Sequence, residues 1–404
     1  MHRSMFPFVL LACSCSAAAP TAPADAGASS DATPGDTTDA ADVEVPFPAP
    51  HPASPRVVSS GGPVLASPKV VPIFFQGDTL QGSIESFLDA LAKSPYWTAT
   101  TKEYGVGALT IAPAVAAGAP PASMTDDDIK AWLAAQTDGT HTGWPKADAS
   151  TIFTVFFPSS TSIDVHGKKS CGAFDGYHLE GQTKDGDPLV YAVLARCAGL
   201  DDVTVAAGHE IMEAATDPLY DTDPAFSATD RDHFIWTVTT AGEVADMCVF
   251  EPQANQRLVG SFMVERSWSN AAALAGHDPC VPAGTDPYFG AAVALEESVM
   301  MKAGSSKIAT KGVRVPVGQT RTVDVALFSD APTDAFEVEA LDGTEFFGGP
   351  KELDLSLDQT SGKNGDVVHL TIKPLRAGPW GGSMLVLRSK LGAMGHVWAG
   401  FVAN

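Results

Sequence analysis

Positively charged residues are scarce in this sequence. The 404 residues include 25 Lys and Arg against 48 Asp and Glu, so the formal net charge is −23. A surface with this balance repels phosphate backbones, which argues against nucleic-acid binding. Hydrophobic residues make up 45% of the chain and charged residues 18%, which is enough for one full hydrophobic core and for a second one.

A run long enough to span a membrane is missing as well. The apolar run near the N-terminus extends only from Phe6 to Ala12, after a basic start at Arg3. It is too short to cross a bilayer, but it has the order of an export signal. The run leads into Leu-Leu-Ala-Cys at residues 10–13, which looks like a bacterial lipobox. We therefore expect residues 1–15 to be a signal peptide with a lipobox, and Cys13 to become lipidated.

This leader predicts export. With the lipid, the protein is an outer-membrane or cell-surface lipoprotein, and the lipid anchor is its only membrane contact. With an ordinary signal peptide that is cut nearby, the protein is periplasmic or secreted. Large apolar side chains are almost absent from residues 16–60, where Ala, Pro, Asp and Thr predominate, so this segment is predicted to be a disordered tether.

Cysteine is rare, with six residues in all, two of them in the leader. The other four are Cys171, Cys197, Cys248 and Cys280. An even set in an exported chain indicates disulfides, and their spacings match no compact zinc-knuckle pattern. Of the three possible pairings, Cys171 with Cys197 and Cys248 with Cys280 is the simplest.

Strand and helix patterns alternate between residues 61 and 290. Short apolar runs at 70–75, 151–158 and 188–195 predict buried strands, and a polar, Gly-rich loop is expected over 159–187. Helices are expected after residue 83, after Thr125 as a capping residue, and from about residue 202 to residue 216. This order predicts an α/β or α+β domain.

The pattern changes between residues 283 and 310. About seven short alternating runs follow, separated by Gly, Asp, Thr and Lys, which is typical of an immunoglobulin-like β-sandwich. We expect this domain to span residues 305–404. It carries no catalytic signature, and we find no internal repeat in the chain.

The residues with a chemical pattern are His209, Glu210 and Glu213 on the last predicted helix. Residues four apart project from one face of a helix, so His209 and Glu213 can hold one cation together. Glu210 lies about a hundred degrees around the helix axis and can act as the general base on a water. Zinc hydrolases use this arrangement, although Glu213 stands where a second His is usual. The alternative is an ordinary acidic helix, in which Glu213 caps a loop or pairs with Arg.

A mononuclear site needs a third protein ligand. In "GEVADMC", Glu243 and Asp246 lie one turn apart if the segment is helical, so Glu243 is predicted to bind the metal and Asp246 to support it or replace it. His178 is the other candidate. Asp217 is expected to end the helix and to accept from backbone amides, or to lie beside the site. Two carboxylates and one imidazole form a harder set than zinc usually has, so one zinc ion is the first expectation, with manganese, iron and calcium as alternatives.

Five motifs follow one another along residues 61 to 282, namely "GGPVLASPKVVPIFF", "CGAFDGYH", "GHEIMEAATDP", "GEVADMC" and "VERSWSNAAALAGHDPC". In this order they resemble the phosphate-induced, EXORDIUM-like family of secreted proteins. The resemblance implies an exported protein with a zincin-like domain, whose His-Glu-x-x-Glu helix looks like a variant zincin helix with Glu213 as the expected residue. The connector at residues 219–241 is longer and more acidic than the family's, and the predicted sandwich lies outside the family.

Two main functions follow from these observations. The first is an exported, peptidase-like metal-dependent hydrolase, with His209, Glu213 and Glu243 as metal ligands and Glu210 as the catalytic base. The alternative is a non-catalytic cell-surface binding or adhesion lipoprotein on the same scaffold, and a third is a structural envelope lipoprotein. A peptide or a cell-envelope polymer is the expected partner, and no dense aromatic stripe indicates a sugar ligand.

Overall fold

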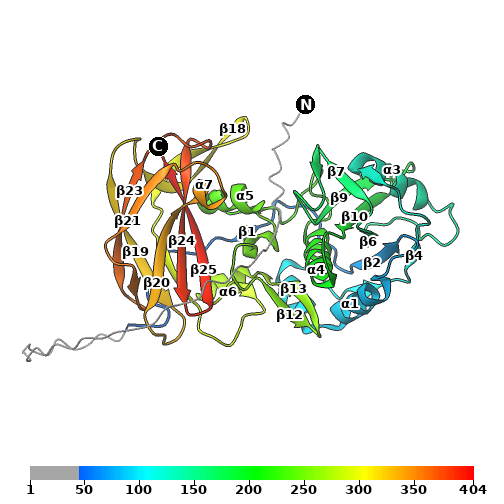
Figure 1. Ribbon diagram of the computed structural model, residues 1–404, viewed down its shortest axis with the longest axis horizontal. Helices are drawn as coiled ribbons and strands as arrows, with labels where there is room; N and C mark the ends of the chain where they lie inside the picture. The colour runs from blue at the N-terminus through cyan, green and yellow to red at the C-terminus, as the bar shows by residue number, and fades with distance from the viewer. Residues whose placement is uncertain (1–44) are drawn as a thin grey trace, which may run out of the picture.

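The computed structural model describes residues 45–404 of the chain. The predicted signal peptide, Cys13 and most of the predicted tether lie outside these residues. Figure 1 shows two bodies side by side, a mixed α/β body and a body made mostly of strands. The order of helices and strands along the chain confirms the prediction that an α/β region is followed by a region of strands.

A six-stranded sheet forms the centre of the α/β body, in the order β3-β2-β6-β10-β9, with β4 also paired to β2. Strands β2, β6 and β10 run parallel, and β9 runs antiparallel to β10. Every residue of β6 is buried, because helices cover both faces of the sheet, and this explains its unbroken apolar sequence. The strands are β2 (Lys69–Phe74), β3 (Thr110–Ile111), β4 (Val115–Ala116), β6 (Thr151–Phe157), β9 (Gly176–Gln182) and β10 (Pro188–Ala195).

Alternate residues of the central strands face two separate cores. In β2, Val70 and Phe74 pack in the core that contains α1, α2 and α4, whereas Val71 and Ile73 lie in the core that contains α3. Helix α4 therefore lies on one face of the sheet, over β9 and β10 (Figure 1). The helices are α1 (Gln81–Lys93), α2 (Pro95–Thr101), α3 (Asp126–Gln136) and α4 (Leu200–Thr216).

Strand β9 lies within the stretch for which the sequence analysis expected a loop, and that expectation is wrong. Its His178 is paired opposite Ala192 of β10. Because Ala192 belongs to the core beneath α4, His178 also lies on the α4 side of the sheet. Tyr177 and Leu179 face the core that contains α3, and the buried polar residues His178 and Glu180 alternate with them. This short alternation lies inside a polar, Gly-rich stretch, which is why the stretch was expected to be a loop.

Short elements connect α4 to the second body. Strand β13 packs against α4, and the segment that contains Glu243 and Asp246 comes back to the same helix. Only Asp246–Cys248 of that segment is helical, as the short 3₁₀ turn η3, whereas Glu243 precedes it in a turn. The other elements here are β11 (Ala228–Thr229), η2 (Arg231–His233), α5 (Phe234–Thr240), β12 (Asn255–Val259), β13 (Phe262–Glu265), β14 (Ser267–Trp268), α6 (Asn270–Ala275) and β15 (Cys280–Val281).

Smaller elements complete the α/β body. Strands β5, β7 and β8 form a three-stranded sheet of their own. Their bounds, with those of the 3₁₀ turn after α2, are η1 (Lys102–Tyr104), β5 (Ser123–Thr125), β7 (Ser162–Val165) and β8 (Lys168–Lys169).

Both predicted disulfides are present. Cys171 and Cys197 join with a Cα–Cα distance of 4.9 Å, and Cys248 and Cys280 with one of 5.9 Å. The second bond ties the 3₁₀ turn that contains Asp246 to β15, so it holds the segment with the two candidate acids against the rest of the α/β body. Within residues 45–404, no helix is both long and apolar enough to cross a membrane.

The second body contains two sheets that share one core. One has the order β16-β19-β23-β21, and the other has the order β17-β18-β25-β24-β20-β22. Its first strand begins at Phe289, before residue 305, where the sequence analysis expected the domain to start. Its elements are β16 (Phe289–Val293), β17 (Glu297–Ala303), β18 (Ser306–Arg314), β19 (Arg321–Ser329), β20 (Phe336–Asp342), α7 (Gly343–Phe346), β21 (Leu353–Leu357), β22 (Ser361–Gly362), β23 (Val367–Pro374), β24 (Gly382–Leu391) and β25 (Met394–Ala403).

The predicted tether, residues 16–60, is too long by its last part. Residues 45–60 contact both bodies. The Ala49 amide donates to Asn364 Oδ1 at 2.9 Å, and the His51 ring stacks on Phe328. Further along, β1 (Val57–Val58) pairs with β11 of the α/β body. The segment is held largely by backbone hydrogen bonds and ring contacts, which composition does not reveal.

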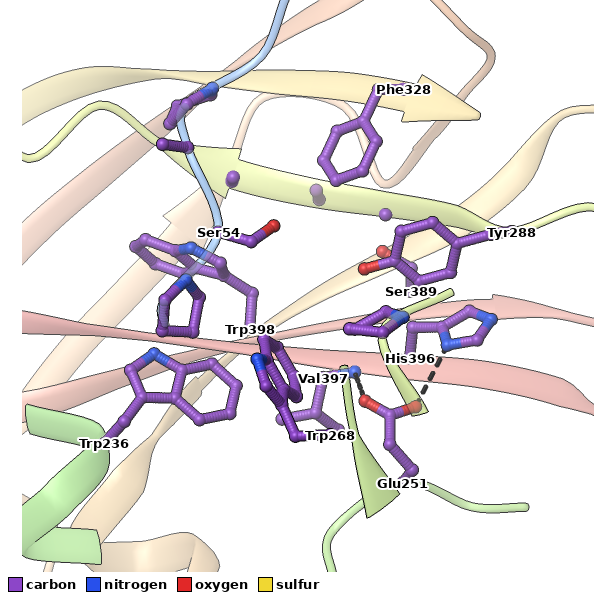
Figure 2. A pocket seen from close by; sticks show the side chains of 17 residues that line it. Ser54, Trp236, Glu251, Trp268, Tyr288, Phe328, Ser389, His396, Val397 and Trp398 are labelled. Atoms are coloured by element: carbon purple, nitrogen blue, oxygen red, sulfur yellow. Dashed lines mark hydrogen bonds and ion pairs between the residues drawn. The ribbon is translucent and has the colours of Figure 1, made fainter. Parts of the chain in front are cut away.

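Aromatic side chains fill the junction between the bodies. Figure 2 shows Trp236, Trp268 and Trp398 gathered there, with His396 beside them. Trp236 Nε1 donates to the Ala399 carbonyl at 3.1 Å, which joins α5 to β25. The pocket between them holds about 20 Å³, room for roughly one water molecule, so it serves as packing between the bodies.

Candidate metal centre

Helix α4 presents His209 and Glu213 on the same face, as their spacing predicts. His209 Nε2 lies 3.1 Å from Glu213 Oε2. The helix begins after Gly199 with two acids in its first turn, which favours its start because the helix dipole is positive there. Its end is also as expected: Asp217 is the capping residue, and its Oδ1 accepts from the Ala225 amide at 2.7 Å.

The first set of candidate ligands, here called the outer group, consists of His209, Glu213 and Asp246. One ligand atom from each lies within 4.8 Å of the others. His209 Nε2 is 3.5 Å from Asp246 Oδ1, and its side chain is 14% exposed. The outer group therefore keeps some access to solvent, as an exchangeable ligand or a water would require.

The second set, here called the inner group, consists of His178, Glu213 and Glu243, again within 4.8 Å of one another. His178 Nδ1 lies 3.8 Å from Glu213 Oε2, and His178 Nε2 lies 3.5 Å from Glu243 Oε1. The exposed fractions of the His178 and Glu243 side chains are only 3% and 7%. The inner group is thus closed from solvent.

Glu213 belongs to both groups. Its Oε1 accepts from the backbone amides of Ala245 and Asp246, each at 3.2 Å. These two bonds dock the downstream segment onto α4 and turn Oε2 toward both imidazoles. The orientation of Glu213 is therefore set by the chain that carries Asp246.

The three predicted metal ligands, His209, Glu213 and Glu243, do not form one group. His209 and Glu213 form a group with Asp246, the residue expected to support the site, whereas Glu243 forms a group with His178. No candidate group within residues 45–404 contains both His209 and Glu243. Asp217 lies in neither group and serves the helix end.

Glu210, the predicted base, lies beside the inner group. Its Oε2 is 3.4 Å from His178 Nδ1. Gly176 of β9 makes room for it, because a Cβ atom there would lie 2.9 Å from Glu210 Cγ. The Glu210 carboxylate is thus held between α4 and β9, where it can exchange a proton with His178 or a nearby water.

One residue of the site was not predicted from the sequence. Glu265 of β13 places Oε2 2.7 Å from His209 Nδ1. Metal-binding histidines commonly donate their second ring nitrogen to a carboxylate, which orients the ring and leaves the other nitrogen for the metal. Glu265 is part of the "VERSW" motif, but no spacing relates it to His209, so only the packing of β13 on α4 reveals the pair.

The site is strongly acidic, and this shifts the pKa of its groups. Burial and then the neighbouring Glu213 raise the pKa of Glu243 well above its usual value and that of Asp246 to about 6. Burial alone would lower the pKa of His209, but Glu213, Asp246 and Glu265 together raise it well above its usual value. Anionic ligands of this kind, held close together, are stabilised by a cation.

A third set of residues within ligand distance does not fit a metal. It consists of Cys171, Asp175 and Cys197, but the two sulfurs are joined in a disulfide. A thiolate is the form of Cys that binds metal, and neither sulfur can supply it while the bond is intact.

Comparison with known proteins adds no assignment: no protein-family model matches the chain, and no curated protein matches it. The chemistry of the centre is accordingly inferred from its own residues.

Proposed function

We propose that this protein is an exported metal-dependent hydrolase, peptidase-like in chemistry, in which the outer group holds one divalent cation. The observation that carries the proposal is the surroundings of His209. One ring nitrogen lies against Glu265, and the other faces the carboxylates of Glu213 and Asp246. This is the environment of a metal-binding histidine whose second nitrogen is held by a carboxylate.

In this proposal Asp246 takes the place that the sequence analysis gave to Glu243. Zinc is the first choice, and the carboxylate-rich donor set also suits manganese, iron or calcium. Such an ion supplies a Lewis acid and lowers the pKa of a water that it binds. Glu210 is the base, and His178, at 3.4 Å, shares the proton that Glu210 takes up.

The proposal extends to the architecture and the setting. We infer that residues 61–290 form a zincin-like domain of the EXORDIUM-like kind, and that the C-terminal sheets form an immunoglobulin-like sandwich. The two disulfides support an oxidising, exported environment. The lipid anchor would hold the enzyme at the cell surface or outer membrane, where its substrate is a peptide or a cell-envelope polymer.

The experiment that tests the proposal combines metal analysis with hydrolysis. The mature protein, with its disulfides formed, is dialysed against zinc, and bound metal is measured by plasma mass spectrometry. A quenched-fluorescent peptide library reports hydrolysis. We expect His209→Ala to lose the outer metal together with activity, and Glu210→Gln to keep the metal and lose at least a hundredfold in rate, on the order of what a general base contributes.

A matched control is His277→Ala. This histidine is 59% exposed and pairs with Asp330, away from both groups, so metal content and activity should be unchanged. Wild-type protein that takes up no zinc would refute the proposed function. Metal uptake without hydrolysis of any library member or of cell-wall fragments would favour the alternative, a non-catalytic binding lipoprotein.

A further inference from the structure

We propose that the inner group is a second cation site and that Glu213 bridges the two ions. This inference rests on the proposed function, because the outer group supplies the first ion. The inner group brings together three separate parts of the chain: His178 on β9, Glu213 on α4, and Glu243 in the turn after α5. It therefore exists only in the folded chain.

Two atoms of the inner group are buried without a hydrogen-bond partner. These are His178 Nε2 and Glu243 Oε1, which lie 3.5 Å apart. A buried polar atom that has lost water and gained no partner is costly, and both of these atoms are metal-ligand types. A cation between them would bind both lone pairs and remove the cost.

Glu213 has the geometry of a bridge. Its Oε1 is occupied by the amides of Ala245 and Asp246. Its Oε2 is left to face His209 Nε2 of the outer group, at 3.1 Å, and the ring of His178 of the inner group, whose Nδ1 is 3.8 Å away. One ligand atom each of Glu213, His178 and Glu243 lies within 4.8 Å of the others, so the same carboxylate reaches the inner group as well. One carboxylate oxygen thus lies between the two imidazoles, and two-metal hydrolases share ligands in this manner across ions that are roughly 3.5–4 Å apart.

The charge of the surroundings also favours two ions over one. Five carboxylates lie on or beside the two groups, and within residues 45–404 their ion pairs are with His178 or His209, never with Lys or Arg. With both imidazoles neutral as ligands, a single divalent ion offsets two of these negative charges and a pair offsets four. The five residues are Glu210, Glu213, Glu243, Asp246 and Glu265.

The second ion would also help to position Glu210, the base of the proposed hydrolase. Glu210 contacts His178, an inner-group residue, at 3.4 Å. A cation on His178 Nε2 would fix the ring and so fix the Nδ1 atom that Glu210 contacts. The inner site thereby connects the predicted base with the metal chemistry of the outer site.

The test is a titration of the mature metal-free protein with Mn²⁺, which is paramagnetic and suits carboxylate-rich sites. Bound metal is measured by equilibrium dialysis, and electron paramagnetic resonance distinguishes isolated Mn²⁺ from a coupled pair. We expect the wild type to bind two equivalents and to show the broadened spectrum of a coupled pair. His277→Ala, the matched control, should behave in the same way.

The variants separate the two sites. Glu243→Gln keeps the side-chain volume and should reduce the stoichiometry from two to one, with the six-line spectrum of an isolated ion. His178→Ala should give the same result, and near-ultraviolet circular dichroism checks that each variant is folded. His209→Ala should also retain one equivalent, in the inner site. Glu213→Gln, which alters the bridge, should weaken both sites.

The outcomes that overturn the inference differ from those that overturn the proposed function. One equivalent in the wild type, unaffected by Glu243→Gln, refutes the inner site and leaves the hydrolase proposal standing. Two equivalents with isolated-ion spectra refute the Glu213 bridge. One equivalent that is lost in both His178→Ala and His209→Ala shows a single ion held by both histidines, which also refutes the second site. No bound metal refutes both proposals.

Discussion

Asp217→Asn is predicted to stabilise the metal-free protein at pH 8, although it alters a buried helix cap. Asp217 is fully buried, and burial raises its pKa from 3.8 to about 6. Its Oδ1 accepts from the Ala225 amide, which an Asn side chain can also satisfy, and its Oδ2 has no partner. Ionisation is therefore costly at this position in the folded state, and the amide avoids that cost.

The size and the sign of the effect follow from the pKa. In the unfolded chain an Asp titrates near 3.9, so the folded group binds its proton more tightly by about two pKa units, or about 3 kcal/mol. Below the pKa of the unfolded chain the carboxyl is protonated in both states and does not reduce the free energy of unfolding. As the pH rises from that value through the folded-state pKa, the unfolded state loses its proton more readily, and the free energy of unfolding falls. The variant should thus exceed the wild type by about 3 kcal/mol at pH 8 and by about 0.5 kcal/mol or less at pH 4.

The assay is urea unfolding at both pH values in the presence of EDTA, followed by fluorescence and circular dichroism. Asp223→Asn is the matched control, because Asp223 lies in the loop after α4 but is exposed, and it should not change stability at either pH. A difference between variant and wild type that is the same at pH 4 and pH 8, or a variant less stable at pH 8, would show that Asp217 does not carry a buried charge.

Four further outcomes are expected. Gly176→Ala should displace the Glu210 carboxylate, since the new Cβ would lie 2.9 Å from Glu210 Cγ, and we expect kcat to fall while metal content measured by mass spectrometry is retained. Glu265→Gln should weaken zinc binding about 10- to 100-fold in competition with a chelating dye, because the His209 ring loses its anionic partner; equal affinity would contradict this role. Because the pKa values of His209 and Glu243 are raised, a metal ion must displace protons from these side chains when it binds. The apparent affinity for metal should therefore increase with pH, and calorimetry in buffers of different ionisation enthalpy should detect the released protons. At pH 8, removing the metal with a chelator should lower the free energy of unfolding by about 2.7 kcal/mol, compared with protein in a free metal concentration one hundred times its dissociation constant. An unchanged urea midpoint would argue against a metal that stabilises the fold.

Local patterns carried much of the fold prediction. Thr125 was expected to cap a helix, and it forms a capping box with Asp128 at the start of α3. The apolar runs at β6 and β10 were expected to be buried strands, and they are. These features depend on contacts within a few residues, or on the uniform burial of a central strand, and so periodicity and side-chain type are sufficient to predict them.

The same patterns failed where polar residues face the site. Strand β9 was expected to be part of a loop because it lies in a polar, Gly-rich stretch, and on its α4 side it carries His178 and Glu180, whose burial only the packing of α4 explains. The tether was predicted to extend to residue 60, but its last part is held by contacts such as the Ala49–Asn364 hydrogen bond. Partners of this kind are supplied by distant parts of the chain, and composition does not contain them.

By itself, the sequence determined the pair on α4, the two disulfides by their simplest pairing, and the order of an α/β half followed by strands. A pair four residues apart on a helix needs only the helix to become adjacent. The tertiary structure decided which residues join that pair. It placed Asp246 with His209, Glu243 with His178, and Glu265 behind the His209 ring. Those positions depend on how β9, β13 and the turn after α5 pack against α4, and such long-range packing leaves no periodic pattern in the sequence.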